Sequence, residues 1–202
     1  MFDMCISNFI KKNSIRELKF EKIPPVVLNT EKMPSTLDSN SIAVFDVNPI
    51  RPLFYASNAH SLEYYNAELT RNFYQHLAYI AEKYEITLII KQKRAQSPVV
   101  ASSFPGLLER LSINRRFKVL NPNVSPIEII KKTRGTIAMP FTSPALIAKQ
   151  FKKPSIFYDA SGRISQKDVG EVPLANSLIP LCAWVELVLK SQSINHKVKD
   201  IE

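Results

Sequence analysis

Two adjacent hydroxyl residues, Thr142 and Ser143, stand where a short apolar run gives way to a predicted helix. The first backbone N–H groups of a helix have no partner inside it, and they are suited to binding phosphate. Side-chain hydroxyls at the same point add donors for the same anion. The pattern predicts a site for a nucleotide phosphate at the carboxyl end of a parallel sheet. The alternative is ordinary helix capping, which contributes about 1 kcal/mol.

A basic segment follows the predicted strand at residues 86–90 and contains Lys91, Lys93 and Arg94. Side chains alternate along a strand, so Lys91 and Lys93 would share one side, as binding one anion requires. Arg94 would point away from the ligand, toward a carboxylate such as Glu128 or Asp46. The alternative is that this segment only leads the strand into solvent.

Carboxylates stand near the ends of two other apolar runs. Asp46 belongs to the run at residues 42–47 and would hold a sugar hydroxyl or orient a basic side chain, or would merely end the strand. Asp159 and Ser161 follow the run at residues 155–158 and would face a nucleoside, although the same residues are typical of an ordinary turn. Because parallel strands end at one edge of a sheet, we expect these residues to converge.

The order of the elements that must position these residues predicts the fold. Apolar runs typical of buried strands alternate with amphipathic patterns typical of helices, which indicates an α/β, Rossmann-like protein with an open, mostly parallel sheet of about five to six strands flanked by helices. Arg51 and Pro52 are expected in a loop. Strands are expected at residues 42–47, 86–90, 117–120, 137–139 and 155–158, and helices at 62–84, 105–111, 144–151 and 178–189, with another that begins at Pro126 after the N-cap Ser125.

Three segments are expected along the chain. Residues 1–40 contain Pro24, Pro25 and Pro34 and predict an N-terminal helix and linker, residues 41–192 a Rossmann-like domain, and residues 193–202 a flexible tail. The chain has only 4 glycines, at spacings that exclude a Gly-rich dinucleotide-binding motif.

Composition narrows the class of protein. The chain has 202 residues and a formal net charge of +9, which suits an anionic substrate, an acidic membrane surface or nucleic acid, or is simply a solvated surface. No apolar run approaches the roughly 20 residues that span a bilayer, and the first residues do not form a secretory signal, so we expect a cytoplasmic protein. Cys5 and Cys182 lack metal-ligand spacing, so we expect no metal and no cofactor.

No residue is assigned to catalysis. His60, in a loop, could contact a donor, whereas His76 lies within a predicted helix and more simply belongs to its surface or core. Trp184 lies on an apolar helical stripe and is most simply a core residue, with stacking on a nucleobase as the alternative. Nucleic-acid binding is not expected, because no known binding motif is present and aromatic residues fall in apolar runs rather than among basic ones.

Four short motifs occur in a set order between residues 41 and 162. They are Val44-Phe45-Asp46-Val47-Asn48-Pro49, Lys91-Gln92-Lys93-Arg94, Pro140-Phe141-Thr142-Ser143 and Lys153-Pro154-Ser155-Ile156-Phe157-Tyr158-Asp159. In these motifs the chain resembles the bacterial polysaccharide-biosynthesis proteins known by a Pro-Phe-Thr-Ser motif. The resemblance implies one lobe, the C-terminal donor-binding lobe, of a two-lobed glycosyltransferase of GT-B architecture.

The resemblance also implies a function and partners. The expected partners are a CMP-, CDP- or UDP-linked sugar and a carbohydrate acceptor in surface or capsular polysaccharide synthesis, with a complementary lobe protein and peripheral association at the inner face of the cytoplasmic membrane left open. The expected nucleotide-binding residues are Asp46, Lys91, Lys93, Arg94, Thr142, Ser143, Asp159 and Ser161. The chain is long enough for one lobe of about 150 residues and not for two, so the alternative is a truncated or split, non-catalytic lobe that binds a partner.

Overall fold

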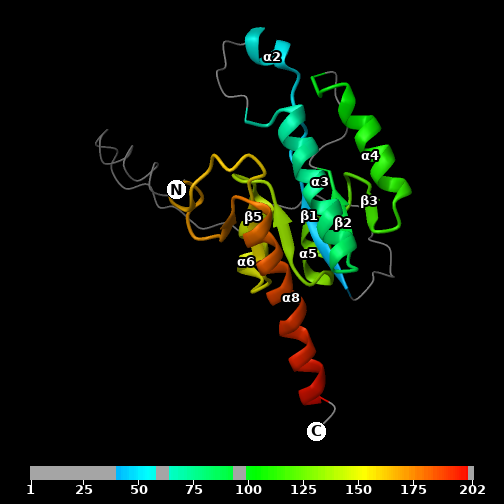
Figure 1. The fold of residues 1–202 in the computed structure, drawn as a ribbon, viewed down its shortest axis with the longest axis vertical. Coiled ribbons are helices and arrows are strands. Elements are labelled where there is room, and N and C mark those ends of the chain that lie inside the picture. Colours follow the sequence, from blue (N-terminus) through cyan, green and yellow to red (C-terminus); the bar gives the residue numbers. More distant parts are fainter. Residues whose placement is uncertain (1–39, 58–63, 93–98, 200–202) are drawn as a thin grey trace, which may run out of the picture.

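The computed structural model describes residues 40–57, 64–92 and 99–199, and side chains as far as residue 191 except at residues 55 and 57. Within them lies one sheet of six parallel strands in the order β3-β2-β1-β4-β5-β6 (Figure 1). This is the strand order of the doubly wound dinucleotide-binding fold. The strands are β1 (Ser41–Phe45), β2 (Thr87–Lys91), β3 (Phe117–Leu120), β4 (Thr136–Ala138), β5 (Ser155–Tyr158) and β6 (Leu174–Ala175).

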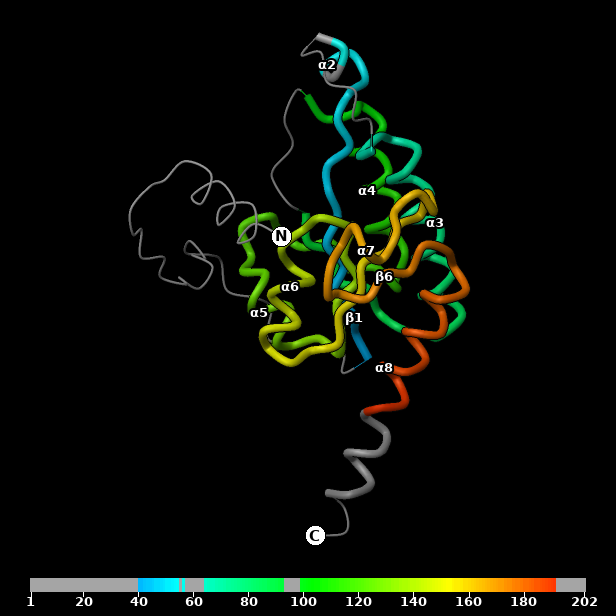
Figure 2. Tube along the Cα trace, turned by 90° about the vertical axis from the view of Figure 1, so that its left-hand side faces the viewer, coloured from blue at the N-terminus to red at the C-terminus, as the bar shows by residue number. Residues whose placement is uncertain are grey.

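Helices cover both faces of the sheet, as the alternating sequence pattern predicted. Figure 2 shows α5 and α6 on one side of the sheet and α3, α4 and α8 on the other. The helices are α2 (Pro52–Ser57), α3 (Ala67–Lys83), α4 (Ser103–Ile113), α5 (Pro126–Lys132), α6 (Ser143–Gln150), α7 (Gln166–Val169) and α8 (Leu178–Lys199).

The core has two layers because each strand is buried on both faces. In β1, Ile42 and Val44 pack with the layer under α3, α4 and α8, whereas Ala43 and Phe45 pack with the layer under α5 and α6. All five residues of this central strand are buried. Such continuous apolar burial is typical of a parallel sheet.

The helix predicted at residues 62–84 forms as α3, but it begins only at Ala67. Asn66 is its N-cap, and the Asn66 side chain accepts a hydrogen bond from the Leu69 backbone N–H at 2.8 Å. Leu69, Phe73 and Leu77 form part of its buried face. This amphipathic helix provides the crossover from β1 to β2.

The predicted fold class is confirmed, and β3 and β5 have the predicted bounds. Helix α2 begins at Pro52, where a loop was expected, because proline is accommodated in the first turn of a helix. Strand β6 has only two residues and gives no periodic signal. Residues 1–39 lie outside the described part of the chain. Helix α8 continues to Lys199, past residue 193, where a flexible tail was expected to start. The predicted division into three segments stays a prediction.

The sheet order places a crevice at one point of its carboxyl edge. From β1 the chain crosses toward β2 on one side, and from β4 it crosses toward β5 on the other. The loops that follow β1 and β4 therefore diverge to opposite faces of the sheet. Ligands of open α/β sheets bind in the crevice that such a divergence leaves.

In the described ranges, no helix is sufficiently long and apolar to span a bilayer.

Candidate functional site

A cavity of about 380 Å³ lies at this crevice, between the ends of β1 and β4. Its volume falls within the range of about 300–1,000 Å³ that is usual for small-molecule sites. The cavity brings together four of the eight expected residues, namely Asp46, Lys91, Thr142 and Ser143. Its walls are formed by Phe45, Asp46, Lys91, Pro126, Phe141, Thr142, Ser143 and Pro144.

The N-terminus of α6 opens on this cavity. Thr142 occupies the N-cap position with extended backbone angles, but its side chain makes no capping hydrogen bond. The buried Thr142 hydroxyl instead donates a hydrogen bond to the Met139 carbonyl at 2.7 Å. The proton of the Thr142 hydroxyl is therefore used within the turn. In this arrangement the hydroxyl neither caps α6 nor donates to a ligand. The exposed Ser143 hydroxyl remains as an anion donor, together with the backbone N–H groups of the first turn of α6 other than at Pro144, which has none.

The turn that leads into α6 has an unusual backbone. Phe141 has a φ of 60°, in the left-handed region that residues other than glycine seldom adopt, and its side chain is 55% exposed at the cavity. Such strain persists only where neighbouring structure imposes it, and it clusters at functional sites.

Two tyrosines hold this turn from the segment before α3. The Tyr65 hydroxyl donates a hydrogen bond to the Pro140 carbonyl at 2.6 Å, and the Tyr64 ring meets Phe141 edge to face with a centroid distance of 6.2 Å. Sequence analysis missed both tyrosines, because they lie about 75 residues before the turn and belong to no motif. Their only signal was an adjacent pair of aromatic residues, which the sequence analysis placed inside the helix predicted at residues 62–84 and which the structure places before α3.

Lys91 and Asp46 form the charged wall of the cavity. Lys91 is the last residue of β2 and is half-buried, and this burial lowers the pKa of its ammonium group, while the Asp46 carboxylate opposes the change. Asp46 is buried and accepts a hydrogen bond from the Tyr74 hydroxyl at 2.7 Å. Burial first, and then the Asp46 charge, raise the pKa of Tyr74 well above its ordinary value. Tyr74 is therefore a neutral donor that fixes the carboxylate beside the lysine.

Asp159 and Ser161 are not among the residues that line this cavity. The fully buried Asp159 carboxylate accepts hydrogen bonds from the Tyr64 hydroxyl, from the N–H and hydroxyl of Ser161, and from the Ile164 N–H, at 2.6–2.9 Å. Burial alone would raise the pKa of Asp159, but these hydrogen bonds outweigh it and the pKa is lowered. The observed contacts make Asp159 the anchor of its own turn and of Tyr64.

The other residues named from the sequence lie elsewhere. Lys93, Arg94 and His60 fall outside the described residues. His76 is hydrogen-bonded through its Nδ1 to the Tyr158 hydroxyl, on the face covered by α3. Trp184 packs against the core next to Gly135, which precedes β4 at the amino edge of the sheet, as the simpler interpretation proposed.

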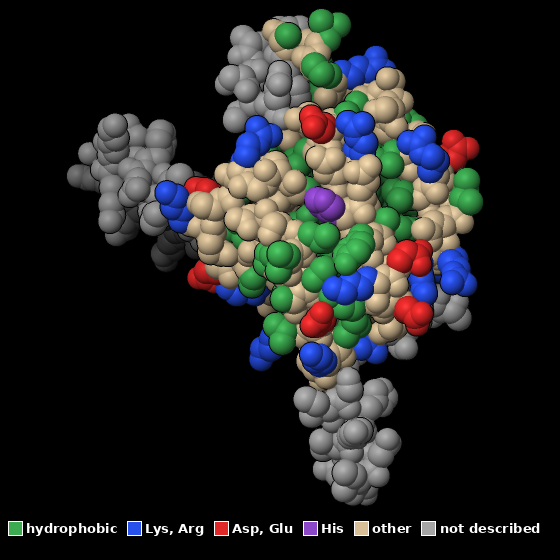
Figure 3. Space-filling model, viewed as in Figure 1, with side chains coloured by type: hydrophobic (Ala, Val, Ile, Leu, Met, Phe, Trp, Pro, Cys, Tyr) green, Lys and Arg blue, Asp and Glu red, His purple; other side chains and the backbone are tan. Residues whose placement is uncertain are grey.

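Positive charge is not concentrated in one patch on the face shown in Figure 3. Lysine and arginine side chains are spread among acidic and apolar ones there. In the described part of the chain, no group of three or more His, Cys, Asp or Glu side chains is placed to hold a metal ion.

The chain was compared with known proteins. The sequence model of a family described as "Polysaccharide biosynthesis PFTS motif protein" matches residues 2–184. A comparison with curated proteins finds no match.

Solved structures give more distant similarities. One is the UDP-GlcNAc 2-epimerase of Methanocaldococcus jannaschii in complex with UDP-GlcNAc and UDP, with 18% identity, a TM-score of 0.49, and coverage of 74% of this chain and 39% of that chain. Another is the beta Kdo 2,4 transferase KpsC of Thermosulfurimonas dismutans, with 8% identity, a TM-score of 0.40, and coverage of 65% of this chain and 38% of that chain. The matched part of each of these structures is about two fifths of its length.

Proposed function

The chain belongs to the polysaccharide biosynthesis PFTS motif family, and we propose that it is the donor-binding lobe of a glycosyltransferase, which holds a nucleotide-activated sugar in the cavity between β1 and β4. In this proposal the sugar is transferred to a carbohydrate acceptor in surface polysaccharide synthesis. A nucleotide sugar carries at least one phosphate, so its site needs backbone amides, a hydroxyl and a cation.

The observation that carries the proposal is the convergence of two anion-binding features on one cavity. The N-terminus of α6, which Thr142 leaves without a side-chain cap, supplies backbone N–H groups and the positive end of the helix dipole. Lys91 supplies an ammonium group from the end of β2, two strands away. Both lie at the divergence of β1 and β4, which is where this fold binds ligands.

The surrounding residues give the proposed site its chemistry. Partial burial of Lys91 removes water from its ammonium group and so strengthens the attraction between this group and a phosphate. The adjacent Asp46 carboxylate favours the charged form of the lysine. The same positive groups would stabilise the charge that develops on the leaving nucleotide phosphate. The proposed role of the Tyr65 hydrogen bond is to keep the turn before α6 in place for this ligand.

Isothermal titration of the full chain with CMP, CDP, UDP and GDP tests the proposal. We expect at least one nucleotide to bind, and we expect Lys91→Met to weaken its binding by about tenfold or more, since a hydrogen bond to a charged group contributes about 1.5–3 kcal/mol. Ser143→Ala should weaken binding less. Lys131→Met is the matched control, because Lys131 is an exposed lysine of α5 beside Phe151 that does not line the cavity.

The proposal fails if none of the four nucleotides binds. It also fails if Lys91→Met, shown to be folded by circular dichroism, binds the best nucleotide as tightly as Lys131→Met does.

A further inference from the structure

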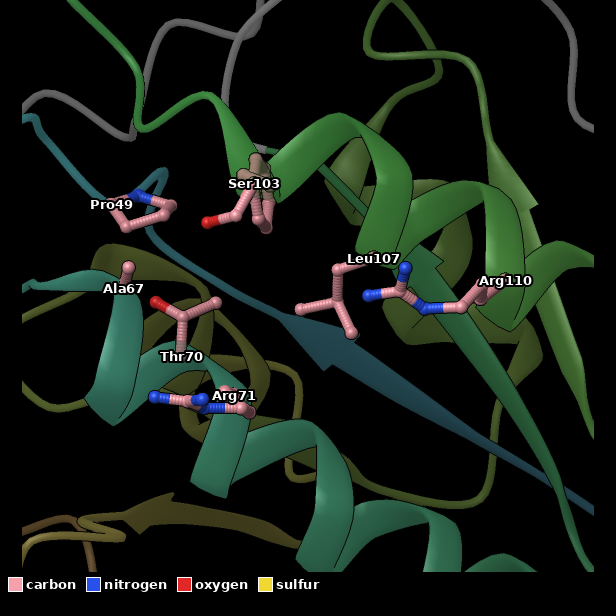
Figure 4. Close-up of a pocket in the computed structure, with 8 residues that line it drawn as sticks. Pro49, Ala67, Thr70, Arg71, Ser103, Leu107 and Arg110 are labelled. Carbon is pink, nitrogen blue, oxygen red and sulfur yellow. The ribbon is translucent and has the colours of Figure 1, made fainter.

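A second cavity, of about 200 Å³, lies between α3 and α4 (Figure 4). Ala67, Thr70 and Arg71 approach it from α3, and Ser103, Leu107 and Arg110 from α4, with Pro49 at one end. It shares no lining residue with the cavity between β1 and β4. Its volume is below the range of about 300–1,000 Å³ that is usual for drug-sized ligands, which limits an occupant to about the size of one monosaccharide.

Two arginines give this cavity its charge. In the described ranges, neither Arg71 nor Arg110 forms an ion pair or hydrogen bond, and no carboxylate is among the residues that line the cavity. The Arg110 side chain runs back along α4, so that its Nη1 is 3.9 Å from the point where a Cβ on Gly106 would stand. The guanidinium group is thus directed toward Leu107 and the cavity rather than along the end of the helix (Figure 4).

The remaining walls combine apolar surface with hydroxyl groups. Leu107, Pro49 and Ala67 supply apolar contacts, and the Ser103 hydroxyl is exposed to the cavity. The Thr70 hydroxyl is buried and donates to the Asn66 carbonyl at 3.0 Å, so it serves the first turn of α3, and the Ser103 hydroxyl is the one open to a ligand. A sugar ring has both apolar C–H groups and hydroxyls, and this lining suits both.

We propose that this cavity binds one anionic monosaccharide unit, and that the exposed side chains of Arg71 and Arg110 turn from its two walls to hold the carboxylate or phosphate of that unit. Guanidinium is the side-chain group best matched to these anions, because its planar fork donates two parallel hydrogen bonds. In a sugar transferase the site would recognise an acidic acceptor. That role rests on the proposed function, whereas the binding of the anionic sugar does not.

The test is a titration of the full chain by two-dimensional NMR with glucuronate, glucose 6-phosphate and neutral glucose. We expect one of the two anions to bind more tightly than glucose, and the better anion identifies the charged group. Arg71→Gln and Arg110→Gln should each weaken its binding by about tenfold, the loss expected for a charge-assisted hydrogen bond. Arg71→Lys should lose part of the affinity, because it keeps the charge but not the fork.

Arg115→Gln is the matched control, since Arg115 is exposed just after α4 and does not line the cavity. The proposal is overturned if neither anion binds more tightly than glucose, or if Arg115→Gln weakens binding as much as Arg110→Gln.

The two proposals can fail separately. Nucleotide titration of Arg110→Gln should give the wild-type affinity, and Lys91→Met should bind the anionic sugar as wild type does. Loss of nucleotide binding by the wild-type chain would leave the anionic-sugar site standing.

Discussion

At the scale of single residues, Thr142 stabilises the turn before α6 through its hydroxyl. Valine has nearly the same shape but cannot donate to the Met139 carbonyl, which the Thr142 hydroxyl reaches at 2.7 Å. Thr142→Val should therefore lower the free energy of unfolding by about 1 kcal/mol. Urea denaturation followed by circular dichroism measures the change. Thr142→Ser, which keeps the hydroxyl, is the control, and equal losses in the two variants would show that the hydrogen bond contributes nothing.

Asp159 makes a second residue-scale prediction, which concerns pH. Its pKa is lowered in the folded protein, so between the folded and unfolded pKa values the unfolded chain binds more protons and stability rises with pH. The contribution of the carboxylate is fully present above the unfolded value of about 3.9 and is lost as pH falls through the folded one. Asp159→Asn should lower the free energy of unfolding by about 1.5–3 kcal/mol at neutral pH, and by progressively less below about pH 4.

Urea denaturation of wild type and variant across this pH range measures that difference. Glu109→Gln, which removes an exposed carboxylate of α4, is the control for the loss of one charge. A gap between wild type and Asp159→Asn that stays constant down to pH 2 would contradict the prediction.

At the scale of elements, Gly135 sets how closely the start of β4 approaches α8. A Cβ added there would lie 2.9 Å from the tip of the Trp184 ring and 3.3 Å from the Pro154 carbonyl oxygen. Gly135→Ala should therefore lower the free energy of unfolding by about 1–3 kcal/mol through overpacking. Thermal unfolding measures this loss of stability. Gly135→Ala should cost less stability when it is made together with Trp184→Phe than when it is made alone, because phenylalanine is shorter than tryptophan.

Gly106→Ala in α4 is the contrasting substitution. Its added Cβ would meet nothing closer than Arg110 Nη1 at 3.9 Å, so the helix preference for alanine should raise stability by up to about 1 kcal/mol. If both alanines changed stability in the same direction, the contact between Gly135 and Trp184 would not be what decides the effect.

The elements that sequence analysis predicted are those with a strong local signal. The apolar runs of β3 and β5 are bounded by polar residues and turns, and their limits were predicted correctly. The helix at Pro52 was missed because the same proline is compatible with a loop and with a first helical turn. The left-handed backbone of Phe141 carries no sequence signal, since the restraint on it comes from Tyr64 and Tyr65, which are distant in the chain.

At the scale of the whole molecule, strand order decides which predicted residues share a cavity. The sequence predicted that parallel strands end at a common edge, but not which strands are neighbours there. Lys91, Asp46 and Ser143 meet because β2, β1 and β4 are adjacent in the sheet. Asp159 follows β5, which is one strand further from the divergence, and the turn after β5 uses its carboxylate. Which strands are neighbours depends on long-range packing, and the sequence pattern of a single segment carries no information about it.

The net charge of +9 gives a prediction for the molecule as a whole. If the proposed site binds a nucleoside diphosphate, the surrounding positive charge assists, and this part of the affinity should weaken with salt, since the Debye length falls from about 10 Å at 0.1 M to about 3 Å at 1 M. The contact with half-buried Lys91 is screened less, so some affinity should persist at high salt. Titration with UDP at both salt concentrations measures the two parts. Uridine, which has no phosphate, is the control, and an equal loss for uridine and UDP would show that the salt effect does not act through the phosphate.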